Sequence, residues 1–158
     1  MDITVNVDDY LLNVRTSGIL IHNNKILLHK NINEEHYALL GGRVAIGENS
    51  EEALRREIME ELGKEIEITG YITTIENLFE MKSSKYYEIL FVHNIEFKDE
   101  EDKKILETMY NKEGKEYLRY EWVDIDELDK YNLKPKSMIK ILKEKQYPAH
   151  IINDDFKV

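Results

Sequence analysis

The chain has 158 residues, 42% of them hydrophobic, and this length and composition favour a single domain with a substantial core. Its net charge of −10 argues against general binding to nucleic acid, because a phosphate backbone would repel it. The absence of cysteine excludes disulfides and thiol catalysis. No apolar run approaches the roughly 20 residues that span a membrane, and the N-terminus lacks the apolar core of a signal peptide, so we expect a cytoplasmic protein.

The first part of the chain is rich in strand-forming residues. Residues 3–7 and 11–22 have this character, and the run GILIHNNKILLHK predicts two strands around Asn23 and Asn24. Asn tolerates positive φ, so a tight hairpin turn is expected there. We interpret the scattered histidines of this region as ordinary strand or surface residues: His22, His29 and His36.

A helix is predicted between a glycine-rich turn and Gly63. Asn49 is a good N-cap, and Glu52, three residues later, completes a capping box. Gly63 stands where a left-handed residue would end the helix. An apolar stripe with a four-residue repeat predicts that the helix packs on a core, through Leu54, Ile58 and Leu62.

Three acidic residues of this helix do not fit an ordinary amphipathic pattern. Glu57, Glu60 and Glu61 stand at i, i+3 and i+4, so they share one face. Like charges at these spacings destabilise a helix by about 0.2–0.5 kcal/mol per pair, and this half of the helix disfavours anions. A hard divalent cation such as Mg²⁺ or Mn²⁺ would remove the repulsion. Taken alone, the run REIMEEL is more typical of a solvated acidic face in an acidic protein.

The wider spacing decides between these readings. From Gly42 the chain runs through five residues to Glu48, then through seven to Arg56-Glu57-Ile58-Met59-Glu60-Glu61-Leu62-Gly63. This pattern resembles the Nudix box, the signature of hydrolases that act on nucleoside diphosphates linked to another moiety. All eight fixed positions are present. Lys64 departs from the aliphatic residue that usually follows the last glycine, at a position that does not touch the chemistry.

The resemblance implies a fold, a cofactor and roles for individual residues. The fold would be an α/β/α sandwich with a mixed sheet, as one domain over residues 1–158 with its core at about 14–145. The cofactor would be Mg²⁺ or Mn²⁺. Arg56 would orient a glutamate through a bidentate pair, and Glu48 would assist from the loop. Carried over by position, the metal ligands would be Glu57, Glu60, Glu61 and the carbonyl of Gly41.

The second half of the chain predicts further strands and a final helix. Residues 65–79 alternate and are rich in Ile and Thr, and Gly70 marks a bulge or bend within them. Residues 85–97 predict the next strand, followed by a charged run that opens a long loop to about Lys115. Residues 117–128 predict a strand that leads into a short helix. A C-terminal helix is expected around residues 138–142, and the tail from Pro148 predicts nothing further.

The general base and the substrate contacts stay open. Glu60 or Glu61 could act as base, and Glu88 on the KYYEIL strand is a candidate outside the box. Arg15 could contact a substrate phosphate or lie on the surface. Gly42 would let the backbone turn close to the metal, and if it needs positive φ, Gly42→Ala should lose activity with little change in metal affinity. The charged run could supply another acid, from Glu100, Glu101, Asp102 or Glu107.

Three functions follow from these features. The first is a Mg²⁺-dependent pyrophosphohydrolase acting on ADP-ribose, a nucleotide sugar, a dinucleoside polyphosphate or a modified nucleoside triphosphate. The second is a module that senses a nucleotide without cleaving it, and the third is an acidic interaction domain without metal. For the enzyme, the expected partner is a small nucleotide substrate. No stable nucleic-acid or membrane partner is expected, and the resemblance leaves a homodimer open. Four aromatic residues could stack on a base or belong to the core: Tyr37, Phe79, Tyr86 and Tyr87.

Overall fold

The computed structural model describes residues 1–104, 108–110 and 117–157. The strands of these parts are β1 Thr4–Val7, β2 Tyr10–Ile19, β3 Ile21–His22, β4 Lys25–Asn31, β5 Tyr37–Arg43, β6 Ile66–Met81, β7 Ser84–Phe97, β8 Thr108–Tyr110, β9 Leu118–Asp124, β10 Leu133–Lys134 and β11 His150–Asp154. The α-helices are α1 Ser50–Leu62 and α2 Ser137–Glu144, and the 3₁₀ helices are η1 Glu100–Lys104 and η2 Ile125–Lys130.

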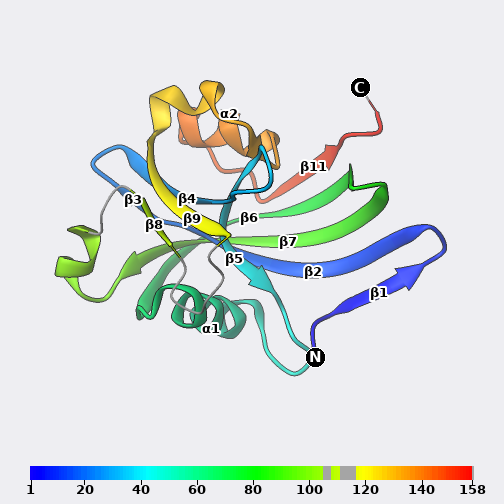
Figure 1. Ribbon diagram of the computed structural model, residues 1–158, viewed down its shortest axis with the longest axis horizontal. Coiled ribbons are helices and arrows are strands. Elements are labelled where there is room, and N and C mark those ends of the chain that lie inside the picture. Colours follow the sequence, from blue (N-terminus) through cyan, green and yellow to red (C-terminus); the bar gives the residue numbers. More distant parts are fainter. Residues whose placement is uncertain (105–107, 111–116, 158) are drawn as a thin grey trace.

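The strands form one mixed sheet that lies between the two α-helices (Figure 1). The main strand order is β11-β6-β7-β2-β5-β4-β9-β8, with β6–β11 and β2–β7 parallel and the other neighbours antiparallel. One apolar cluster contains the inner side of α1, through Leu54, Ile58 and Leu62, and the other contains Met138 and Leu142 of α2. The predicted α/β sandwich with a mixed sheet is therefore confirmed, whereas the extent of the domain stays a prediction.

Strand β5 is the element that positions the site, because it changes partner along its length. Its residues 37–39 pair with β4, and its residues 40–43 pair with β2. The second half then delivers the chain through a short loop to α1 (Figure 1). Among the described residues, no helix is long and apolar enough to cross a membrane.

Helix α1 begins and ends as the sequence predicts. The side chain of Asn49 accepts a hydrogen bond from the backbone N–H of Glu52, and the Glu52 carboxylate accepts one from the Asn49 N–H. Gly63 ends the helix in the left-handed region, with φ of 67°. The capping box and C-cap fix the length of the helix, and so fix which turn carries the glutamates.

The strands agree with the predictions in most places. Asn23 and Asn24 both have positive φ in the turn between β3 and β4, and the β6–β7 register shifts at Gly70. The tail forms β11, which the sequence did not predict, and it pairs parallel to β6. Part of the predicted charged loop is the 3₁₀ helix η1, and Glu107 lies outside the described residues.

Removing the N-cap should loosen helix α1. Asn49→Ala loses one half of the capping box, and we expect the free energy of unfolding to fall by about 1 kcal/mol. Urea denaturation followed by circular dichroism measures this change. Asn132→Ala, at an exposed position outside the helices, is the matched control and should leave stability nearly unchanged. Equal losses in the two variants would contradict a capping role.

Candidate active site

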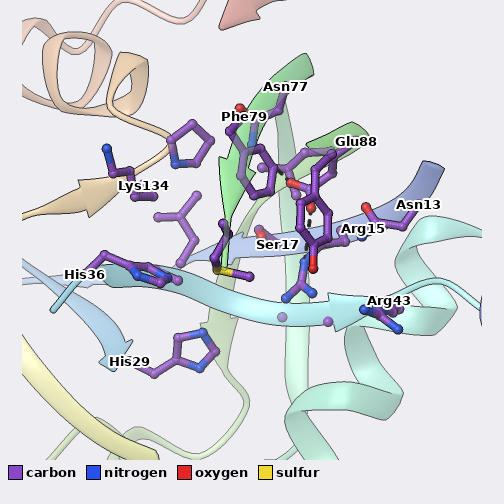
Figure 2. Close-up of a pocket in the computed structure, with 18 of the residues that line it drawn as sticks. Asn13, Arg15, Ser17, His29, His36, Arg43, Asn77, Phe79, Glu88 and Lys134 are labelled. Carbon is purple, nitrogen blue, oxygen red and sulfur yellow. Dashed lines mark hydrogen bonds and ion pairs between the residues drawn. The ribbon is translucent and has the colours of Figure 1, made fainter. Parts of the chain in front are cut away.

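A cavity of about 750 Å³ lies beside β5 and is lined by residues from α1, β2, β6, β7 and the C-terminal segment. Figure 2 shows Asn77, Phe79 and Glu88 together in one part of it, away from His29 and His36. Arg43 lies at the end of β5 near α1. Six residues predicted from the sequence line this cavity: Arg15, Gly41, Gly42, Glu57, Glu61 and Glu88.

The two glycines of β5 make room for the site in different ways. Gly41 has φ of 140°, and a side chain there would also overlap the carbonyl oxygen of Thr16 on β2. The sequence predicts a need for Gly42 on the condition that its φ is positive, and Gly42 does not have a positive φ. Gly41 has the positive φ instead. A Cβ at Gly42 would instead overlap the carboxylate of Glu57. Gly42 is therefore required for the close approach of Glu57 to β5.

Arg56 joins the loop, the helix and the strand through its guanidinium. It makes a bidentate pair with Glu48, with its Nε 3.0 Å from Oε2, and its Nη1 donates to Glu57 Oε1 at 2.9 Å. Its Nη2 also donates to the backbone carbonyl of Arg43 at 3.1 Å. The hydrogen bond from Arg56 lowers the pKa of Glu48, and the carboxylates raise the pKa of Arg56. The bidentate contact of Arg56 is thus present, and its orienting role in catalysis stays a prediction.

The three helix glutamates occupy different environments. Glu57 is half-buried, and burial raises its pKa while Arg56 opposes that rise. Glu61 is buried and accepts a hydrogen bond from the Tyr120 hydroxyl at 3.0 Å. Glu60 is exposed and lies 3.2 Å from Nη1 of Arg56. Across the part of the chain that the structure describes, no three His, Asp or Glu side chains are gathered closely enough to share a metal ion.

The chemistry of these side chains nevertheless suits a hard divalent cation. Glu57 and Glu61 both line the cavity together with the backbone of Gly41, so every donor is an oxygen, as Mg²⁺ and Mn²⁺ prefer. Glu60 would join them by leaving Arg56, across one turn of the same helix. A cation would also stabilise the ionised form of Glu57, which burial disfavours.

Glu88 is the buried carboxyl of the cavity outside the box. Its side chain is 8% exposed, its Oε1 accepts from Asn77 Nδ2 at 3.2 Å, and its Oε2 lies 3.8 Å from Arg15 Nε. Burial raises the pKa of Glu88, and the Arg15 charge and the Asn77 hydrogen bond lower it. Arg15 thus lies in the cavity rather than on an open surface.

Other sequence candidates have mixed outcomes. Phe79 and Tyr86 line the cavity as a stacked pair, with ring centroids 4.8 Å apart. Asp102 pairs with Lys64 at 2.8 Å and does not line the cavity. Two of the histidines interpreted as ordinary residues, His29 and His36, do line it.

Several cavity residues were missed from the sequence. Asn13 and Asn77 interrupt strands that are otherwise rich in apolar residues, and this was the available signal, because Asn is disfavoured in strands. Asn153 lies in the tail, where no strand was predicted. All three are buried polar side chains.

Carboxylates that can hold a divalent cation beside a cavity suit metal-assisted hydrolysis. A family model described as "NUDIX domain" matches residues 12–144, and the chain belongs to this family. This membership places it among hydrolases that act on phosphoric anhydride bonds and that generally use divalent metal ions.

Solved structures share the fold at low sequence identity. A UDP-X diphosphatase has a TM-score of 0.60 and 19% identity. The match covers 88% of this chain and 66% of the UDP-X diphosphatase, so this chain spans just under two thirds of that protein's length. An ADP-ribose pyrophosphatase from Streptococcus suis has a TM-score of 0.61 and 12% identity, over 89% and 98%. A NUDIX hydrolase from Nitrosomonas europaea has a TM-score of 0.62 and 18% identity, over 90% and 79%. A search of curated proteins finds no match.

Substituting Gly42 should weaken metal binding. In Gly42→Ala the new Cβ displaces the Glu57 carboxylate, so we expect affinity for Mg²⁺ to fall by about tenfold or more, together with activity. Isothermal titration calorimetry with Mg²⁺ measures the affinity. Gly70→Ala is the matched control, because its Cβ meets only Asn94 at 4.0 Å, and it should bind Mg²⁺ normally. Unchanged Mg²⁺ affinity in Gly42→Ala would contradict the steric role.

The buried Glu88 should make stability depend on pH. The folded protein keeps the Glu88 proton to a higher pH than the unfolded chain does. The free energy of unfolding therefore falls as the pH rises above the ordinary Glu pKa of 4.5. It levels off at a pH above the raised pKa of folded Glu88. Glu88→Gln should lose this contribution and show a smaller decline in melting temperature between pH 4.5 and neutral pH. Glu96→Gln, exposed on the same strand, should follow the unmodified protein. A decline as steep in Glu88→Gln as in the unmodified protein would disprove the assignment.

Proposed function

We propose that this protein is a Mg²⁺- or Mn²⁺-dependent pyrophosphohydrolase that cleaves a nucleoside diphosphate linked to another moiety. The observation that carries the proposal is that Glu57 and Glu61 of the box share one cavity with Arg15 and Arg43. Carboxylates for a cation and guanidinium groups for phosphate thus line the same space. A diphosphate needs both, because its charge must be neutralised before water attacks phosphorus.

The residues of the chain would divide the work of binding and positioning. Arg56 fixes the Glu57 carboxylate against β5 and ties the loop through Glu48 to the helix. A divalent cation, when bound by Glu57, Glu60, Glu61 and the Gly41 carbonyl, would polarise phosphate oxygens and lower the pKa of water. Arg15, which also lines the cavity, would hold a substrate phosphate. The proton of the attacking water would pass to a carboxylate, with Glu60, Glu61 and Glu88 as the candidates.

The class of substrate is proposed from the family and from charge. The related folds include proteins described as a UDP-X diphosphatase and an ADP-ribose pyrophosphatase. We propose a nucleoside diphosphate derivative of this kind as substrate, because the net charge of −10 disfavours long nucleic acids. Residues 1–158 would act as one domain in the cytoplasm, either alone or as a homodimer.

Substituting one glutamate of the box tests the proposal. Purified protein with Mg²⁺ should hydrolyse at least one member of a panel of ADP-ribose, nucleotide sugars, dinucleoside polyphosphates and oxidised nucleotides. Glu60→Gln should reduce kcat by at least about 10²-fold, and a chelator should abolish turnover. Glu51→Gln, exposed on the first turn of the same helix, should keep full activity.

Two outcomes would contradict this assignment. Undiminished turnover in Glu60→Gln would exclude that residue from the reaction. Tight nucleotide binding with no product after long incubation in Mg²⁺ or Mn²⁺ would instead identify a module that senses a nucleotide without cleaving it.

A further inference from the structure

A row of polar side chains crosses four adjacent strands of the sheet. Asn13 of β2 lies opposite Glu88 of β7, Glu88 lies opposite Asn77 of β6, and Asn77 lies opposite Asn153 of β11. Residues directly opposite one another project from the same face of a sheet, and these four side chains all line the cavity. Their exposed fractions are between 1% and 9%. We call these four residues the polar row.

Hydrogen bonds within the polar row orient its members. Asn153 Nδ2 donates to Asn77 Oδ1 at 3.0 Å, and Asn77 Nδ2 donates to Glu88 Oε1 at 3.2 Å. Asn153 Nδ2 also donates to Asp155 Oδ1 at 3.1 Å. The donors at this end of the row therefore point along the sheet toward Glu88, and their hydrogen bonds hold its carboxylate in place.

Two acceptor atoms at the Glu88 end of the row are left for a ligand. Asn13 Oδ1 is buried and has no hydrogen-bond partner among the described residues. Glu88 Oε2 forms an ion pair with Arg15 Nε at 3.8 Å, which is beyond hydrogen-bond distance, so within the described parts of the chain it keeps room to accept a hydrogen bond. A buried acceptor without a partner is unfavourable, and a ligand that brings N–H donors would satisfy both atoms.

The neighbouring rows of the same face are apolar or aromatic. On one side Phe79 and Tyr86 lie opposite one another with their rings stacked at an interplanar angle of 4°. On the other side Leu90 lies opposite Ile75, and both are buried. Polar acceptors between flat apolar surfaces suit a planar ring that presents hydrogen-bond donors along one edge.

We propose that the polar row binds the base of the substrate and selects guanine. This inference rests on the proposed function, because it assigns the nucleoside part of the same substrate. Guanine presents two adjacent donors, the ring N1–H and the 2-amino group, which match a carboxylate with a further acceptor beside it. Adenine and cytosine instead place a ring acceptor next to their amino group, and that acceptor would face the Glu88 carboxylate.

The C-terminal strand adds one residue to this site from outside the region that matches the family model. Asn153 lies in β11, beyond residues 12–144 that match the family model. It reaches the cavity because β11 pairs with β6 and places Asn153 opposite Asn77. Base selection would therefore depend partly on a segment outside the matched family domain, whereas the box acts on the diphosphate.

The test measures binding without hydrolysis. The full chain is titrated by calorimetry with GMP, IMP, AMP, CMP and UMP in a chelator, so that no turnover occurs. GMP should bind at least about tenfold tighter than AMP, and tighter than IMP, which lacks the 2-amino group. Glu88→Gln should reduce the preference for GMP over AMP to about twofold or less, and Asn13→Ala should weaken GMP binding. Glu96→Gln, at an exposed position near the end of β7, should keep the preference.

The outcomes separate this inference from the proposed function. Equal affinity for GMP, IMP and AMP would overturn guanine selection even if the protein hydrolyses a diphosphate substrate. A preference for GMP in a protein that hydrolyses nothing would support the polar row and count against the enzyme. If Glu88→Gln keeps the preference for GMP but loses turnover on every substrate, Glu88 acts as a base, and the inference is wrong.

Discussion

The guanidinium of Arg56 is the group on which the arrangement of the site depends. It is bonded to Glu48 of the loop, to Glu57 of the helix and to the Arg43 carbonyl of β5. The capping box also joins the loop to the helix, and the apolar face of α1 packs on the core. Because Glu57 is half-buried, its charge would be strongly unfavourable without this partner. One planar cation thus positions the loop and stabilises a carboxylate beside β5.

Arg56 also changes the interpretation of the glutamate triplet. The repulsion among Glu57, Glu60 and Glu61 pointed to a divalent cation, yet Arg56 already neutralises part of it by contacting both Glu57 and Glu60. Repulsion alone is therefore weaker evidence for metal than the sequence suggested. The stronger argument is spatial, since Glu57 and Glu61 line a cavity with the backbone of Gly41.

The sequence predicted features that depend on neighbours along the chain. The capping box, the left-handed Gly63 and the Asn23–Asn24 turn are fixed by residues a few positions apart, and all are confirmed. The requirement for Gly42 was predicted for the wrong reason, because its close approach to Glu57 depends on how α1 packs against β5. The long spaced pattern of the box predicted the family without any knowledge of the fold.

The polar row could not be predicted, because its members come from residues 13, 77, 88 and 153. A one-residue shift in register on any strand would turn its side chain to the other face, and register is set by the whole sheet. The part of the cavity proposed to hold a cation and the part proposed to bind the base have separate supports. Helix α1 carries the carboxylates for a cation, and strands β6 and β11 carry the asparagines that orient Glu88. If the row binds the base as proposed, a substitution in it would change which base is bound while the Arg56 network stays intact.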